Sequence, residues 1–246
     1  MKSRWLAFLF IAVLAFAALG ARAASKKPAA GQLVDAGSFG IFVNGRRVAT
    51  ETFQIEQRDG ASTARSELKV EDGTKGGQTS EMQLNAAGDL MRYEWRENKP
   101  GTAQTVVEPN NEFLIEHVLL APTDKPRDVP FLLPHSTVIL DDNFFMHRQI
   151  LAWRYLGSSC TPTQGKVECK LSRTQFGILV PQQQVSGIVA LEYGGRETIK
   201  YKGADQPMNR INLKSENTSD WSLWLDDNNK VVRIVIADSN TEAVRD

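Results

Sequence analysis

The strongest constraint on the fold is an alternation of apolar and polar residues that runs through most of the chain. It is clearest in "GSFGIFVNGRRVATETFQIEQ", residues 37–57, where the alternation continues on both sides of Asn44-Gly45. An Asn-Gly pair between two such runs predicts a β-hairpin with one apolar and one polar face. Because a two-stranded hairpin is not stable alone in water, other parts of the chain must cover the apolar face.

Segments with the same period of two follow along the chain. Among them are "TARSELKVE", "QTSEMQLN" and "DLMRYEWRE" in the first half, and "VSGIVALEYG", "MNRINLKSE" and "KVVRIVIAD" in the second. Short turn sequences such as "DGTKGG" and "YGGRE" separate them. About a dozen strands of this kind predict a mainly β fold, a large curved antiparallel sheet or half-open barrel with a solvated outer face.

One segment between the two halves has helical character. "PHSTVILDDNFFMHRQILAWRYLG" contains Asp141 and Asp142, which suit a helix N-terminus, and Gly157, which suits a helix end. It therefore predicts a helix over about residues 142–156. Its apolar residues fall on three sides of that helix, which indicates burial almost all round. We expect the sheet to wrap around this central helix, and the helix to cover the apolar face of the hairpin.

The N-terminus has the pattern of a secretory signal peptide. Two basic residues precede an apolar run over residues 5–19, and an A-x-A cleavage pattern follows at residues 21–23. A membrane anchor is the alternative, but a membrane span needs about 20 apolar residues, and this run is shorter. We predict a signal peptide over residues 1–23, a periplasmic or secreted location, and a cleaved chain that is not an integral membrane protein.

The rest of the chain is predicted to have two parts. Residues 24–36 should form a flexible lead-in, and residues 37–246 a single β-shell domain. Removal of residues 1–23 takes away three basic residues and no acidic ones, which leaves 26 basic against 29 acidic residues. A mildly acidic chain argues against nucleic acid as a partner.

The only two cysteines, Cys160 and Cys169, flank a turn that contains Pro162 and Gly165. In an oxidising compartment this arrangement predicts a disulfide that closes a hairpin. A metal site would need more ligands nearby, and the three histidines have no metal-binding spacing. We predict no metal and no cofactor.

The sequence contains no recognisable catalytic constellation. It has no G-x-S-x-G motif, and its histidines and paired acids do not combine with an activated nucleophile. We therefore expect no enzymatic activity.

A polar stripe on the predicted helix is the candidate site. Asn143, His147 and Arg154 fall close together at 100° per residue on a helix that is otherwise apolar. They either face solvent at the open edge of the shell or line the mouth of a cavity, where they would hold the polar head of an amphiphile. An arginine fork suits a phosphate or carboxylate head. We include Trp153 in this candidate ligand site.

Several segments carry a family resemblance. "VILDDNFFMHRQILAWRY", "FGILVPQQQ", "GIVALEYGGRETI" and the ending "LWLDDNNKVVRIVIADSNTEAVRD" resemble a group of uncharacterised bacterial secreted proteins, filed as domains of unknown function. The opening hairpin and the closing strands resemble the half-open barrel of the periplasmic lipoprotein carriers LolA and LolB. This resemblance implies a curved sheet with a helix inside and a cavity able to hold acyl chains, and it transfers no catalytic residue.

These observations favour a soluble periplasmic protein that binds an apolar or amphiphilic ligand, in envelope lipid or lipoprotein handling. Its expected partners are a lipid or other hydrophobic ligand and a protein of the cell envelope. The alternative is a structural or interaction module with a filled core and no ligand.

Overall fold

The computed structural model describes residues 31–73, 76–98, 103–121, 123–163, 166–169, 173–215 and 219–246. Residues Gly31–Asp246 form one compact unit. The predicted signal peptide and residues 24–30 of the predicted lead-in lie outside the described residues. Among the described residues, no helix is both long enough and apolar enough to cross a membrane.

The described residues form strands and two helical segments. The first strands are β1 (Gln32–Val43), β2 (Arg46–Arg58), β3 (Ala61–Val70), β4 (Gln78–Leu84), β5 (Leu90–Glu97), β6 (Gln104–Asn110), β7 (Phe113–Leu119), β8 (Arg127–Phe131) and β9 (Val138–Ile139). The helix α1 (Met146–Ser159) follows, and then β10 (Cys160–Thr163), β11 (Lys166–Cys169), β12 (Arg173–Val180) and the 3-10 turn η1 (Pro181–Gln183). The last strands are β13 (Val185–Tyr201), β14 (Ala204–Ser215), β15 (Trp221–Leu225), β16 (Val231–Ile236) and β17 (Thr241–Arg245).

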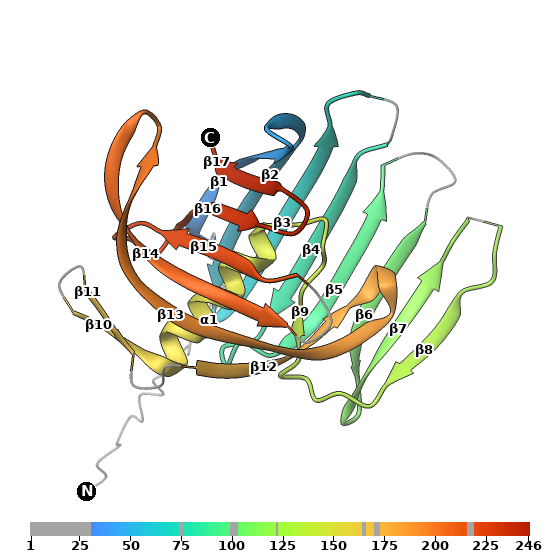
Figure 1. Cartoon of the computed structure of the whole chain (residues 1–246). Helices are drawn as coiled ribbons and strands as arrows, with labels where there is room; N and C mark the ends of the chain where they lie inside the picture. Colours follow the sequence, from blue (N-terminus) through green and yellow to red (C-terminus); the bar gives the residue numbers. More distant parts are fainter. Residues whose placement is uncertain are drawn as a thin grey trace, which may run out of the picture. The chain divides into compact units, whose positions relative to one another are not determined.

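One sheet of 15 strands contains all strands except β10 and β11, which pair with each other. Its order is β8-β7-β6-β5-β4-β3-β2-β1-β17-β16-β15-β14-β13-β12-β9, so two sequential meanders meet where β1 pairs with β17 (Figure 1). The sheet is not closed, because its end strands β8 and β9 do not pair with each other. The prediction of a mainly β fold with a large, half-open antiparallel sheet is confirmed.

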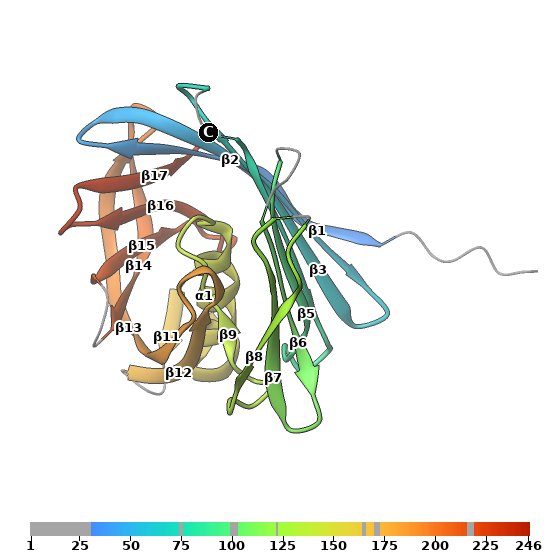
Figure 2. The same ribbon diagram turned by 90° about the vertical axis from the view of Figure 1, so that its right-hand side faces the viewer.

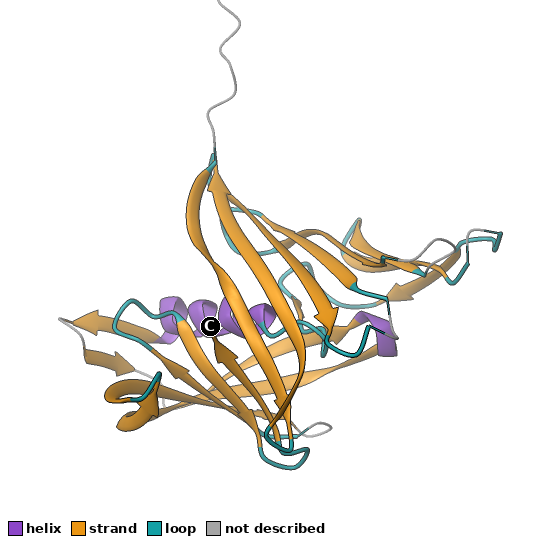
Figure 3. Cartoon of the chain, turned by 90° about the horizontal axis from the view of Figure 1, so that it is seen from above, coloured by secondary structure: helices purple, strands orange, loops and turns teal. Residues whose placement is uncertain are grey.

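The sheet curls around α1. Strands β1–β8 form one wall and β12–β17 the other, with the helix between them (Figure 2). The same arrangement is seen from above, where the helix runs inside the curve of the strands (Figure 3). Eight of the helix residues are buried, so the helix is part of the hydrophobic core.

The opening hairpin has the expected turn and the expected buried face. Asn44 and Gly45 both have positive φ, 51° and 76°, as a tight hairpin turn between two twisted strands requires. On the inner face, the rings of Phe39 and Phe53 stack with centroids 5.2 Å apart, and both side chains are buried.

The helix begins and ends later than the sequence predicts. It runs over Met146–Ser159 instead of residues 142–156, and neither Asp141 nor Asp142 is its N-cap residue, which is Phe145. Asp141 instead accepts a hydrogen bond from the Asn143 backbone N–H, 2.8 Å away, in the turn that precedes the helix. Gly157 does not end the helix, because the chain continues as α-helix to Ser159 before β10.

The predicted lead-in also differs from the structure. Residues 32–36 belong to β1 and pair with the far end of β2 instead of forming a flexible segment. The Asp35 side chain in this part of β1 is buried, which gives the segment a fixed position.

Candidate functional site

A groove runs between α1 and strands β1–β4 and has a volume of about 720 Å³. Apolar side chains form most of its walls, among them Ile55, Ala64, Met82, Ile139 and Leu151. These residues come from β2, β3, β4, β9 and α1, so the curl of the sheet brings together segments that lie far apart in the sequence. Ligand pockets typically enclose roughly 300–1,000 Å³ and have mostly apolar walls, so this groove is the candidate site.

Two of the residues predicted for a ligand site, Trp153 and Arg154, line this groove. The Arg154 guanidinium donates a hydrogen bond from Nη1 to the Gly88 carbonyl, 3.2 Å away, and its Nη2 lies 3.7 Å from Asp89 Oδ1. It also lies 6.0 Å from the ring centroid of Phe176. Its side chain remains 26% exposed, so the guanidinium is accessible from the groove and from solvent.

Trp153 separates two cavities. Its indole N–H donates to the Asn229 carbonyl over 2.6 Å, which fixes the orientation of the ring. The ring lines the main groove on one side and a smaller cavity of about 300 Å³ near Cys160 on the other. Trp153 is therefore a half-buried wall of the site.

His147 does not belong to the groove. Its side chain is fully buried, and Nδ1 accepts a hydrogen bond from the Asp141 backbone N–H over 3.2 Å. Burial, assisted by the neighbouring Arg148 charge, holds the pKa of His147 well below its ordinary value, so the ring is neutral. The prediction that His147 lines a cavity mouth is wrong, because the sheet covers this side of the helix.

Asn143 lies apart from the other two members of the predicted stripe. It precedes the helix in a turn and lines a separate cavity of about 370 Å³, together with Phe145, Trp221 and Ser239. The stripe of Asn143, His147 and Arg154 is therefore not one surface. The helical projection fails because residues 141–145 are not part of the helix.

The helix N-terminus is held by a buried carboxylate that we did not predict. Glu51 of β2 is fully buried, and its carboxylate accepts hydrogen bonds from the backbone N–H groups of Phe145, at 2.7 Å, and Met146, at 3.2 Å. Ser66 of β3 donates its hydroxyl to the same carboxylate. Burial raises the pKa of Glu51 to about 7, although these hydrogen bonds oppose the shift. A negative charge here is favourable to the free N–H groups and the dipole of the helix.

Arg148 lies next to this carboxylate and is also buried. Its guanidinium donates to the Phe144 carbonyl over 3.1 Å and to Asp142 Oδ1 over 2.8 Å. It also lies 4.0 Å from the ring centroid of Trp221, a cation–π contact. Arg148 is therefore the helix arginine that pairs with Asp142.

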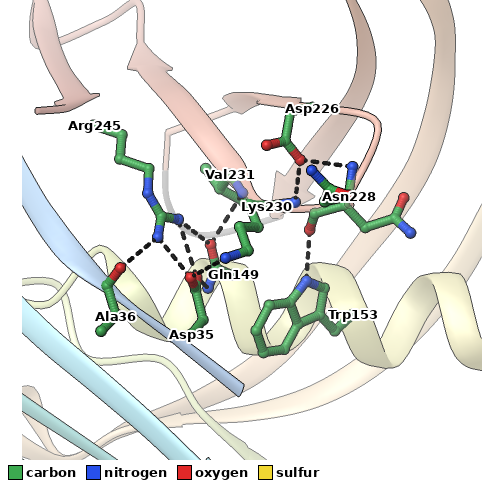
Figure 4. A network of polar contacts seen from close by, with 10 residues as sticks. Asp35, Ala36, Gln149, Trp153, Asp226, Asn228, Lys230, Val231 and Arg245 are labelled. Atoms are coloured by element: carbon green, nitrogen blue, oxygen red, sulfur yellow. Dashed lines mark hydrogen bonds and ion pairs between the residues drawn. The ribbon is translucent and has the colours of Figure 1, made fainter. Parts of the chain in front are cut away.

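A second unpredicted cluster centres on Asp35, whose side chain is fully buried (Figure 4). Arg245 donates to it from Nη2 and Nη1, over 2.6 and 3.0 Å, and Lys230 Nζ lies 2.8 Å away. Gln149 of α1 donates to Asp35 over 2.6 Å and accepts the Val231 backbone N–H over 3.0 Å. Burial alone would raise the pKa of Asp35, but hydrogen bonds from Arg245, Lys230 and Gln149 hold it below its ordinary value. We call Asp35, Gln149, Lys230 and Arg245 the Asp35 cluster.

The sequence does contain a signal for both buried acids. Glu51 has the same position in the alternation as Phe53 and Ile55, and Asp35 the same as Phe39. Because alternate residues of a strand share a face, both carboxylates had to point inward with the core residues.

The cysteine prediction is confirmed. Cys160 and Cys169 form a disulfide, and they are directly opposite each other in the β10–β11 hairpin. Within the described part of the chain, no group of three or more histidine, cysteine, aspartate or glutamate side chains could hold a metal ion.

Comparisons with known proteins give one structural match. No protein-family model matches the chain, and no curated protein matches it. Among solved structures, the chain is similar to a β-barrel-like protein of Brucella abortus, described as a domain of unknown function, DUF1849. The identity is 8% and the TM-score 0.46, and the match covers 88% of this chain and 98% of that chain.

Proposed function

We propose that this protein binds an apolar or amphiphilic ligand in the groove between α1 and β1–β4. The observation that supports this proposal is an apolar groove of about 720 Å³ inside a sheet that is not closed. A bound apolar ligand would remove the apolar walls of this groove from water, which is favourable.

The walls suit a flexible apolar chain. Ile55, Ala64, Met82, Ile139 and Leu151 present no hydrogen-bonding side chain to the groove. Each methylene group of a ligand that is buried there would contribute roughly 0.8 kcal/mol. Micromolar binding requires about 8 kcal/mol, and association costs roughly 4 kcal/mol or more, so a chain of about 15 buried methylenes is needed.

We place this function outside the cytoplasm, in the periplasm or a secreted fraction. The predicted signal peptide and the disulfide between Cys160 and Cys169 support that location. The resemblance of the opening hairpin and closing strands to the carriers LolA and LolB favours a role in envelope lipid or lipoprotein handling, with an envelope protein as partner. In this proposal the protein binds and releases its ligand without catalysing a reaction.

The test is the binding of a fluorescent fatty-acid probe, combined with native mass spectrometry of the purified protein. We expect saturable probe binding, and a co-purified lipid where the groove is occupied. Ser62→Phe should weaken probe binding about tenfold or more, because Ser62 lines the groove and the ring would occupy part of it.

Thr63→Phe is the matched control. Thr63 is the next residue of β3 and is also half-buried, but it does not line the groove and should leave probe affinity unchanged. Equal effects of the two variants would argue that the probe binds elsewhere. Failure of the wild-type protein to bind any probe or lipid would favour an interaction module with no ligand.

A further inference from the structure

The groove contains a single charged side chain. Among the described residues that line it, Arg154 is the only one with a formal charge, and no acidic side chain lines it. Arg154 lies toward the C-terminal end of α1, and its side chain is partly exposed. The interior of the groove, around Met82, Ile139 and Leu151, is buried and apolar. The groove therefore combines one partly exposed cation with buried apolar walls.

The Arg154 guanidinium has hydrogen-bonding capacity that the protein does not use. Toward other described residues it makes one hydrogen bond, to the Gly88 carbonyl. Its ion pair with Asp89, at 3.7 Å, is longer than a hydrogen bond. Because a guanidinium has five N–H donors, an oxygen ligand could still be bound by two of them.

From the charge and the unused donors of Arg154 we infer that the groove binds a single-chain amphiphile with a carboxylate head group, and that Arg154 binds this head group. The inference rests on the proposed function and names the ligand class. A guanidinium binds a carboxylate with two parallel N–H···O hydrogen bonds. One guanidinium balances one negative charge. A phosphate dianion would place a second negative charge near Asp89, and the described residues that line the groove supply no further cation, so a phosphate head fits less well.

The experiment compares hexadecanoic acid with hexadecan-1-ol, which have the same tail but differ in the charge of the head. Both displace a neutral fluorescent probe from the wild-type protein at a pH where the acid is ionised. We expect the acid to bind about tenfold more tightly than the alcohol, as charge-assisted hydrogen bonds would provide. Arg154→Gln should abolish this preference, because it should weaken the affinity for the acid about tenfold and leave the affinity for the alcohol unchanged.

Three further variants sharpen the result. Arg154→Lys should give an intermediate preference, because it keeps the charge but loses the paired donors. Asp89→Asn should strengthen binding of the acid and not of the alcohol, because it removes a competing negative charge. Arg92→Gln, at an arginine that pairs with Glu94 and Glu108 and does not line the groove, should change neither affinity.

The outcomes separate the inference from the proposed function. Equal binding of acid and alcohol by both the wild-type protein and Arg154→Gln would overturn the head-group assignment and leave the apolar groove intact. Binding of neither compound by the wild-type protein would overturn both. Retained affinity of Arg154→Gln for the alcohol shows that the variant is folded, so a loss specific to the acid supports the inference.

Discussion

The contribution of the Asp35 cluster to the stability of the fold can be tested directly. Asp35 lies in β1, and Gln149 lies in the helix. Of the two cations, Lys230 immediately precedes β16 and Arg245 lies in β17. Replacement of Asp35 by asparagine keeps the size of the side chain but removes its charge. Two cations are then left next to a neutral group.

The expected loss of stability follows from burial. Removal of one partner from a buried ion pair typically costs about 3–5 kcal/mol, because it leaves an uncompensated buried charge. Arg245 is 12% exposed, but Lys230 is 37% exposed and can turn toward water, so we expect the lower limit, about 3 kcal/mol. For a domain of this size that corresponds to a fall in Tm of roughly 6–12 °C.

The assay is urea and thermal unfolding of Asp35→Asn beside a surface control. Arg65→Gln breaks a 2.8 Å ion pair with Glu81, but the Arg65 side chain is 52% exposed, so its loss should cost less than about 1 kcal/mol. Addition of Lys230→Met to Asp35→Asn should recover part of the loss, because one unpaired cation is removed. The reasoning is refuted if Asp35→Asn costs no more than Arg65→Gln.

The Asp35 cluster also predicts a pH dependence. The pKa of Asp35 is lowered in the folded state, so its contribution is present above the ordinary aspartate pKa and is lost as the pH falls through the lowered value. The free energy of unfolding should therefore fall more steeply with decreasing pH in the wild-type protein than in Asp35→Asn, because the variant lacks this titrating group.

Three further outcomes are expected. Because the pKa of Glu51 is raised to about 7, the stability that its protonated form provides should be lost as the pH rises from about 5 to 7. Glu51→Gln should remove this pH dependence from the free energy of unfolding measured with urea. Thiol titration of the unfolded, unreduced protein should detect no free thiol, and reduction of Cys160–Cys169 should cost roughly 2–3 kcal/mol; two free thiols would contradict the disulfide. Trp153→Ala should lower the free energy of unfolding by about 1–3 kcal/mol, less than the loss of a fully buried tryptophan, because the ring is half-buried and donates a hydrogen bond to Asn229. The same variant should weaken probe binding, and an unchanged affinity would show that the ring does not line the ligand site.

The sheet was predictable because its signal is local and repeated. Alternation over each strand and turn residues between strands determine a sequential meander, and the sheet follows sequence order from β1 to β8 and from β12 to β17. The pairing of β1 with β17 was not predictable in this way. It joins residues about as far apart as the chain allows, such as Gly40 and Val244, and no local pattern encodes that contact.

The candidate site was only half predictable, because a helical projection assumes that every residue in the window is helical. Trp153 and Arg154 lie within α1 and both line the groove, whereas Asn143 precedes the helix. His147 is helical, but the projection cannot tell a polar residue that faces solvent from one that accepts a hydrogen bond inside the core. Burial of a polar group depends on partners from elsewhere in the chain.

The position of the groove follows from where the helix is anchored. Trp153 bonds to Asn229 before β16, and the hydroxyl of Tyr155 accepts the Tyr193 N–H of β13 over 3.0 Å, so the C-terminal half of α1 is tied to the wall of the last strands. Toward the wall of β2–β5, the same half makes one hydrogen bond to a described residue, from Arg154 to Gly88. Space therefore remains between the helix and the wall of β2–β5. The hydrogen bonds that tie the helix to the wall of the last strands determine the volume of this space. Loss of the Tyr155 hydroxyl should for this reason alter ligand affinity although Tyr155 does not line the groove, whereas a groove shaped only by its own apolar walls would be insensitive to it.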